Sequence, residues 1–191
     1  MKKKLMFAFI FVIVLAGPPV FAVDIYKVDP AHSTIGFKVR HMGISYVSGK
    51  FDTFEGALSF DGDILTGLDG KVDVNSINTA VSNRDDHLKS DDFFSAQKFP
   101  TMTFKISKVT QDGSTIAVVG DLTIRGATKI VVLQGEFGGF VDTDKGKKTG
   151  VTLEGEINRQ DFGLAFNKLL EAGQAMVGNQ VKITLELEAG M

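Results

Sequence analysis

Hydrophobic and polar residues alternate with a period of two along most of the chain after residue 22, a pattern typical of β-strands that bury one face. In residues 34–40, for example, Ile35, Phe37 and Val39 alternate with small or polar residues. The same alternation recurs in residues 53–60, 102–107, 115–125, 151–157 and 181–188. With "IYKVD", "KVDVNSI" and "KIVVLQGEF", these segments predict about eight antiparallel strands.

Turn residues separate the strands. Clusters rich in Gly and Asp, such as "FDGDILTG", "QDG" and "DTDKGKKTG", are typical of hairpin connections. A single open sheet of this size would expose its edges, so we expect it to close into a barrel or fold into a sandwich. Gly56 and Gly120 fall on the apolar face of their strands, where they mark either bends or internal space. The predicted fold class is all-β.

The period of two fails in residues 82–95, "SNRDDHLKSDDFFS". Ser82 or Asn83 is expected to cap a short helix whose first turn carries Asp85 and Asp86, which is the favourable end for negative charge. A second turn would begin at Ser90. These residues predict a small helical insert that packs against the barrel.

The first 22 residues predict a cleavable secretory signal. They combine Lys2, Lys3 and Lys4 with an apolar run that is shorter than a membrane-spanning helix and a small residue at Ala22. We therefore expect residues 23–191 to form one exported domain in the periplasm, without an integral membrane span. The chain has no cysteine, which excludes disulfides and thiolate metal ligands.

The charge balance argues against nucleic acid as a partner. Three of the 21 basic residues but none of the 23 acidic ones fall in residues 1–22, so the remainder is more acidic than the formal net charge of −2 for the whole chain. Proteins that bind nucleic acid need basic patches that displace counterions from phosphates.

The three histidines could take part in a catalytic triad or in a metal site. His87, Asp85 or Asp86 and the distant Ser33 could form a triad, but the chain has no G-x-S-x-G nucleophile elbow. His32, His41 and His87 lack the i, i+4 spacing of helical metal ligands. No metal site is therefore predicted, and hydrogen bonding to loops or carboxylates is the simpler interpretation of each histidine.

Several ungapped blocks resemble one known family. They are "VDPAHSTIGFKVRHMG", "GKFDTFEG", "RDDHLKSDDFFSAQKFPTMTF", "GDLTIRGATK", "INRQDFGL" and "VGNQVKITLELEA". In this order, from about Asp24 to Ala189, they are similar to the YceI-like family of polyisoprenoid- or lipid-binding proteins. The resemblance implies a lipocalin-like antiparallel β-barrel around an apolar tunnel that holds a long isoprenoid or fatty chain, usually in an exported protein without catalytic activity. Tyr26 and Phe166 stand where that family often carries tryptophan.

A binding role needs no cofactor beyond the bound lipid. The residues expected to line the cavity are Ile35, Phe37, Val39, Phe54, Leu58, Phe93, Phe94, Met102, Phe104, Phe162 and Phe166. The polar residues expected at the rim are His32, Arg84, His87 and Arg159, with the two arginines pairing with Asp85, Asp86 or Asp161. The alternative is a hydrolase or isomerase that uses His32, His87 and a carboxylate at the tunnel mouth. A homodimer is a further expectation.

Removal of residues 1–22 is expected to leave a folded domain, because the apolar segment contributes no strand to the barrel. Circular dichroism and urea unfolding of residues 23–191 check this expectation. Loss of cooperative unfolding in that protein would contradict the predicted boundary.

Overall fold

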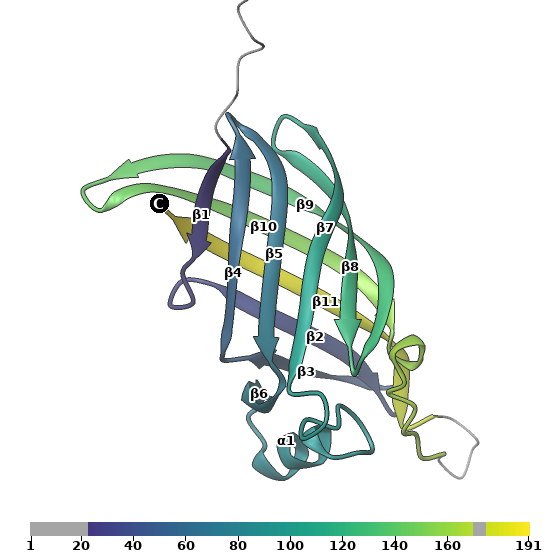
Figure 1. The fold of residues 1–191 in the computed structure, drawn as a ribbon. Helices are drawn as coiled ribbons and strands as arrows, with labels where there is room; N and C mark the ends of the chain where they lie inside the picture. Colours follow the sequence, from purple (N-terminus) through teal and green to yellow (C-terminus); the bar gives the residue numbers. More distant parts are fainter. Residues whose placement is uncertain (1–22, 170–174) are drawn as a thin grey trace, which may run out of the picture.

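The computed structural model describes residues 23–169 and 175–191, and the predicted signal lies outside them. Figure 1 shows a barrel of long strands with its helical parts gathered at one end. The strands are β1 (Asp24–Val28), β2 (Thr34–His41), β3 (Ser45–Phe51), β4 (Phe54–Asp61), β5 (Ile64–Asp73), β6 (Ile77–Asn78), β7 (Thr101–Asp112), β8 (Thr115–Ile124), β9 (Ala127–Thr143), β10 (Gly146–Asn158) and β11 (Val177–Gly190). One α-helix, α1 (Ser82–Lys89), and two 3-10 helices, η1 (Val74–Ser76) and η2 (Arg159–Phe162), join them.

Eight of the strands close into an antiparallel barrel, which confirms the predicted fold. Their order is β1, β4, β5, β7, β8, β9, β10 and β11, and β11 returns to β1 through the pairs Lys27↔Gly190 and Val28↔Ala189. Closure gives every barrel strand two neighbours and removes the exposed edges of an open sheet.

Strand β11 carries more than one partner along the same edge. Its last residues pair with β1, whereas residues 177–186 pair with β2. Strands β1 and β2 therefore follow one another along β11 and are separated only by residues 29–33. From β2 the sheet continues to β3 and the short β6, so this side extends beyond the closed barrel (Figure 1).

One end of the barrel is filled by four aromatic rings, which we call the aromatic plug: Tyr26, Phe60, Phe137 and Phe140. Phe60 lies 5.7 Å from Tyr26, 5.2 Å from Phe137 and 5.1 Å from Phe140, measured between ring centroids. Tyr26 and Phe60 are 1% and 0% exposed. Edge-to-face and tilted contacts of this kind add to the stabilisation from burial alone. This end of the barrel is solid core.

The helical insert covers the opposite end, as the loss of strand periodicity predicts. The predicted cap is wrong: the N-cap residue is Val81, whose side chain makes no capping hydrogen bond. Asp85 instead accepts hydrogen bonds from the backbone N–H of Thr79 (2.9 Å) and from its hydroxyl (2.5 Å). The helix is therefore tied to the segment before it by a carboxylate in its first turn.

Two inward-facing glycines in strands show opposite local environments. A Cβ atom on Gly135 of β9 would collide with the backbone carbonyl of Thr152 on the neighbouring β10. A Cβ atom on Gly70 of β5 would meet nothing closer than the carbonyl oxygen of Glu55 at 3.9 Å. Both glycines noted in the sequence are crowded: a Cβ atom on Gly56, which borders internal space, would lie 2.8 Å from the Asp69 carbonyl oxygen, and one on Gly120 would lie 2.7 Å from the Phe104 ring.

Gly135→Ala is expected to lower the free energy of unfolding by about 1–3 kcal/mol or more, because a backbone carbonyl cannot move aside as a side chain can. Gly70→Ala is the matched control and should change stability by less than about 1 kcal/mol in either direction. Urea unfolding of both variants provides the test. If both variants lose the same free energy of unfolding, the close approach of β10 to β9 is not the reason for glycine at position 135.

Candidate functional site

An internal cavity of about 170 Å³ lies in the part of the barrel between the aromatic plug and the insert. Its wall combines side chains from β2, β4, β5, β7 and β11 with residues of the insert. Eight of the eleven residues predicted to line a cavity do line it: Ile35, Phe37, Val39, Phe54, Phe93, Phe94, Met102 and Phe104. Whether they touch a ligand stays a prediction.

The other three predicted lining residues lie elsewhere. Leu58 faces inward and is 0% exposed, but it pairs with Tyr26 in register and belongs to the filled end of the barrel. Phe162 of η2 is buried in the core, and Phe166 packs its ring 5.0 Å from that of Phe93. Alternation predicts which face of a strand is inward, but it cannot tell how far along the barrel axis a residue lies.

Sequence reasoning missed several wall positions. Gly36, Gly56 and Gly70 line the cavity. Gly70 leaves room where a side chain would stand, whereas a Cβ atom on Gly36 would lie 2.8 Å from the Thr184 hydroxyl and one on Gly56 would lie 2.8 Å from the Asp69 carbonyl oxygen. Val181, Ile183, Leu185 and Leu187 of β11 also line it; their common face was visible in the alternation, but no feature distinguished it from solid core. Tyr26, one of the two departures from the family pattern, belongs to the plug and not to this wall.

Arg159 is the charged side chain that is buried in the cavity wall, with 4% of the residue exposed. Its Nε donates to the carbonyl of Gly178 at 2.9 Å, and Nη1 donates to those of Phe166 at 2.8 Å and Leu164. Its Nη2 donates to the Val177 carbonyl and to a side-chain oxygen of Asn179, both at 3.2 Å.

The Arg159 guanidinium is therefore neutralised by carbonyl dipoles and not by Asp161, which corrects the predicted ion pair. Burial lowers its pKa below the usual value, although guanidinium remains charged at any physiological pH. With all five donors used, the side chain fixes residues 164–166 against the first residues of β11. We interpret it as a structural residue of the cavity wall.

The predicted pairing of Arg84 is also wrong. Its Nε and Nη2 donate to the hydroxyl and the carbonyl oxygen of Thr79, at 2.8 Å and 2.9 Å. Because Asp85 binds the same threonine from the other side, Thr79 joins the two charged groups indirectly. Arg84 thus stabilises the insert and does not line the cavity.

His87 lies beside the cavity wall without reaching the cavity. Its Nε2 is 2.8 Å from Asp92, and its ring meets the rings of Phe93 and Phe166 edge-on at 5.1 Å and 5.0 Å. It therefore connects the insert to the segment that follows η2.

His32 belongs to a separate polar cluster in the junction between β1 and β2. Its Nδ1 is 2.9 Å from Asp29, and this hydrogen bond is the main reason why the pKa of Asp29 lies below its ordinary value. Asp29, His32 and Glu188 each place a potential metal-ligand atom within 4.8 Å of the others. The Lys148 ammonium, however, already lies between the carboxylates, 3.9 Å from Asp29 and hydrogen-bonded to Glu188.

The catalytic alternative required His32 and His87 to converge at the tunnel mouth. His32 lies near Glu188 in the last part of β11, whereas His87 contacts Phe166, which precedes the start of β11. Neither histidine lines the cavity. The geometry gives the two side chains separate structural partners.

Comparison with known proteins identifies the class. The sequence model of the YceI-like domain matches residues 26–189, and the chain belongs to that family. It is 38% identical over 167 residues to the UPF0312 protein SA2479 of Staphylococcus aureus N315, covering 85% of this chain and 95% of that protein.

Solved structures of similar fold include a Campylobacter jejuni YceI protein, with a TM-score of 0.70 and 34% identity over 85% of this chain and 95% of that one. Burkholderia cenocepacia BcnA gives a TM-score of 0.72 at 23% identity, covering 85% and 99%. A polyisoprenoid binding domain from Saccharophagus degradans gives 0.64 at 18% identity, covering 86% and 97%. The last two likenesses concern the fold alone.

Across the described residues, none of the helices has the length and apolar character needed to span a bilayer.

Arg159→Lys is expected to lower the free energy of unfolding by about 1–3 kcal/mol, because one ammonium cannot satisfy five separate acceptors and leaves buried carbonyls unpaired. Arg84→Lys is the control. The hydrogen bonds of Arg84 go to a single threonine, so the free energy of unfolding should fall by about 1 kcal/mol or less. Urea unfolding measures both, and a larger effect at Arg84 would overturn the role given to Arg159.

Proposed function

We propose that the protein is an exported, non-catalytic binding protein that holds a long apolar chain, a polyisoprenoid or a fatty-acyl derivative, inside the barrel. The observation that carries the proposal is the cavity itself: an apolar space in a barrel whose opposite end is packed solid by aromatic rings. A barrel evolved only for stability would be expected to fill this space, because internal voids forfeit packing energy.

Burial of hydrocarbon supplies the binding energy. At roughly 0.8 kcal/mol for each CH₂ group, a ten-carbon stretch gains on the order of 8 kcal/mol before the cost of ordering the chain. No charged contact with the protein is needed, which fits a wall whose buried cation, Arg159, already has its donors satisfied.

The cavity volume limits how much of the chain enters. About 170 Å³ is close to the roughly 150 Å³ of an apolar cavity that binds one benzene, and below the range of about 300–1,000 Å³ common for ligand pockets. A long chain exceeds this volume, so part of it would lie outside the cavity unless side chains of the insert shift. Leu88, Phe93 and Phe94 line the cavity from the insert and are the side chains whose displacement would enlarge it.

Similarity to known structures supports the ligand class. The Saccharophagus degradans protein of similar fold is described as a polyisoprenoid binding domain. Export is supported by the predicted signal in residues 1–22, and the periplasm is part of the proposal. Solvent extraction of the purified native protein followed by mass spectrometry should release an isoprenoid or fatty-chain lipid. A protein that yields none and binds no added lipid would refute the proposal.

Phe104→Asp is expected to abolish lipid binding even where the variant still folds, because it places a carboxylate against the apolar chain. Burial of that unpaired charge costs several kcal/mol unless the pKa of the new carboxyl rises. The measurement is bound lipid per folded protein.

Lys105→Asp is the control on the same strand. The Lys105 side chain is 76% exposed, so the new charge stays solvated and bound lipid should be retained. The variant also places a carboxylate opposite Asp69 on β5, a solvent-exposed like-charge contact that lowers stability slightly. If Lys105→Asp loses its lipid while Phe104→Asp keeps it, the assigned facing of β7 is inverted.

A further inference from the structure

Three short segments meet at the end of the molecule where β2 turns into β3. The backbone N–H of Met42 donates to the carbonyl of Met176 at 2.8 Å, and that of Met176 donates to the carbonyl of Lys168 at 2.8 Å. Leu169 pairs with Ala175 in the same ladder. The β2–β3 turn is thus joined by hydrogen bonds to the segments on either side of residues 170–174.

Large apolar side chains are exposed on these joined segments. Ile44 in the turn is 83% exposed, Leu169 is 68% exposed and Tyr46 at the start of β3 is 52% exposed. A single exposed apolar residue is normal, but several on adjoining segments indicate a surface that contacts something. With Lys38, Arg40 and Lys168, these residues form what we call the tip surface.

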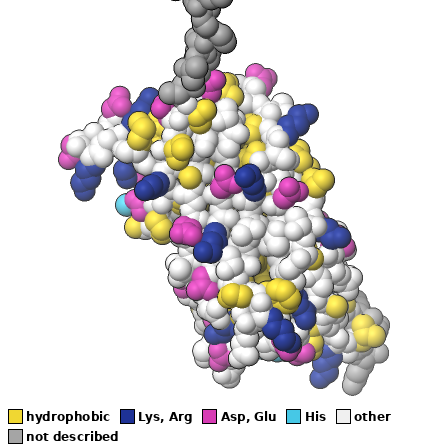
Figure 2. All heavy atoms as spheres, in the orientation of Figure 1, with side chains coloured by type: hydrophobic (Ala, Val, Ile, Leu, Met, Phe, Trp, Pro, Cys, Tyr) yellow, Lys and Arg dark blue, Asp and Glu magenta, His cyan; other side chains and the backbone are white. Residues whose placement is uncertain are grey.

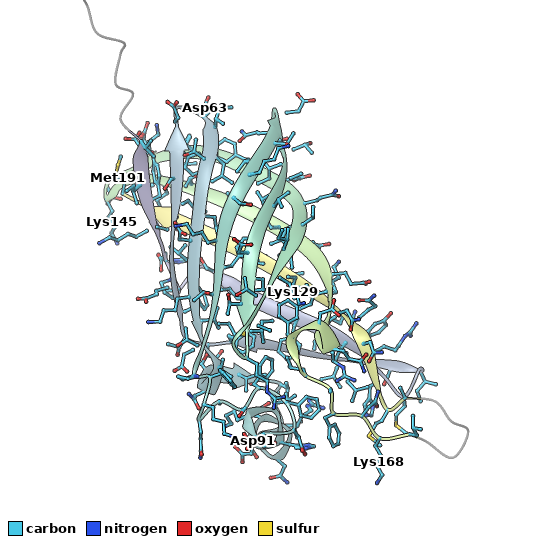
Figure 3. All side chains as sticks on the ribbon, turned by 45° about the vertical axis from the view of Figure 1, so that its right-hand side comes forward. Asp63, Asp91, Lys129, Lys145, Lys168 and Met191 are labelled. Carbon is cyan, nitrogen blue, oxygen red and sulfur yellow. The ribbon has the colours of Figure 1, made fainter. Side chains whose placement is uncertain are left out.

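The basic residues give the tip surface its charge. Lys38 and Arg40 of β2 lie over the Tyr46 ring, 4.6 Å and 4.5 Å from its centroid. Within the described residues, neither forms an ion pair with a carboxylate, whereas the neighbouring Lys182 is paired with Glu154 at 2.6 Å. Lys168 points away from the barrel at the same end (Figure 3). Figure 2 shows hydrophobic and basic side chains lying together toward the lower end of the molecule.

We propose that the tip surface docks on a lipid bilayer that carries anionic headgroups. Exposed aliphatic and tyrosine side chains enter the headgroup region, while lysine and arginine contact the negative lipids and keep their charge in water. A second copy of the chain fits this surface less well, because a two-fold contact would bring the same cations against each other.

The tip surface is continuous with the cavity. Val177 lines the cavity and directly follows Met176, and it pairs with His41 beside the turn. Val39 and Val181, paired on neighbouring strands, continue the same wall inward. The other end of the barrel is closed by the aromatic plug and carries charges of both signs, among them Asp63 and Lys145 (Figure 3). Docking by the tip therefore lets an apolar chain pass between bilayer and cavity with little exposure to water.

This inference rests on the proposed function for its purpose, but its test is separate. The full chain is expressed, the N-terminus of the purified protein is determined, and all variants are compared with that same N-terminus. Co-sedimentation is measured with vesicles of phosphatidylcholine alone and of equal phosphatidylcholine and phosphatidylglycerol. The tip variants are Ile44→Ser with Leu169→Ser, and Lys38→Gln with Lys168→Gln. The matched controls are Ile130→Ser, which removes an aliphatic residue 74% exposed on β9, and Lys129→Gln, beside it on the barrel (Figure 3).

We expect the unchanged protein to bind the anionic vesicles, and to bind them more weakly as salt is added. Each double variant of the tip surface should have a vesicle partition coefficient that is about tenfold or more lower. The β9 controls should stay within about twofold. Equal losses in the controls, equal binding to neutral vesicles, or no vesicle binding would overturn the inference. So would sedimentation data in which the tip variants convert a dimer to a monomer, since the surface would then bind a second copy.

Binding of a fluorescent fatty acid, added without vesicles, separates this inference from the proposed function. Tip variants should bind it as the unchanged protein does. If the unchanged protein binds the fatty acid but not the vesicles, the docking inference fails and the proposed function stands. If it binds vesicles but binds no fatty acid and yields no lipid on solvent extraction, the proposed function fails and the tip remains a membrane-binding surface.

Discussion

The structure depends on one constraint: both edges of β11 must find hydrogen-bond partners. Strand β10 covers one edge over most of its length, while β1 and β2 divide the other between them. The junction of β1 and β2 therefore lies against β11. There the Ser33 hydroxyl accepts a hydrogen bond from the backbone N–H of Glu188 at 2.9 Å, and the backbone N–H of Asp29 donates to the Glu188 carbonyl at 2.8 Å. Without this junction the last pairs that close the barrel would be unsupported.

The division of β11 also explains why one barrel contains both solid core and open space. Where β1 completes the ring, Tyr26 reaches the other plug aromatics and the interior is filled. Where β2 and β3 lead away, Phe37 and Val39 face a wider interior that the insert covers from outside. The cavity thus lies on the side of the protein that is held together by side chains and loops, including Arg159 and the contacts of His87.

A binding function follows more naturally from this arrangement than a catalytic one. The polar residues that drew attention in the sequence are used for structure: His32 in the junction, His87 against Phe93, and Arg84 on Thr79. What remains at the cavity is mostly hydrocarbon and glycine backbone, which suits a ligand recognised by its apolar surface. The covering insert and the neighbouring tip surface are the parts through which such a ligand would have to enter.

The sequence by itself determined the strands, their inward faces and the helical insert, because alternation and turn chemistry are local properties of the chain. Alternation left a barrel and a sandwich open, and the closed barrel was implied only by the family resemblance. The sequence also located Phe37, Phe93 and Phe104 on the inside. Only the tertiary structure decided that Leu58 lies in solid core while Phe54, four residues earlier on the same face, lines the cavity. It likewise decided that Arg159 binds carbonyls of nearby Leu164 and Phe166 together with those of Val177 and Gly178 in β11. Both outcomes depend on how far along the barrel each residue lies and on which segments cover it, and these are set by pairings between residues far apart in sequence.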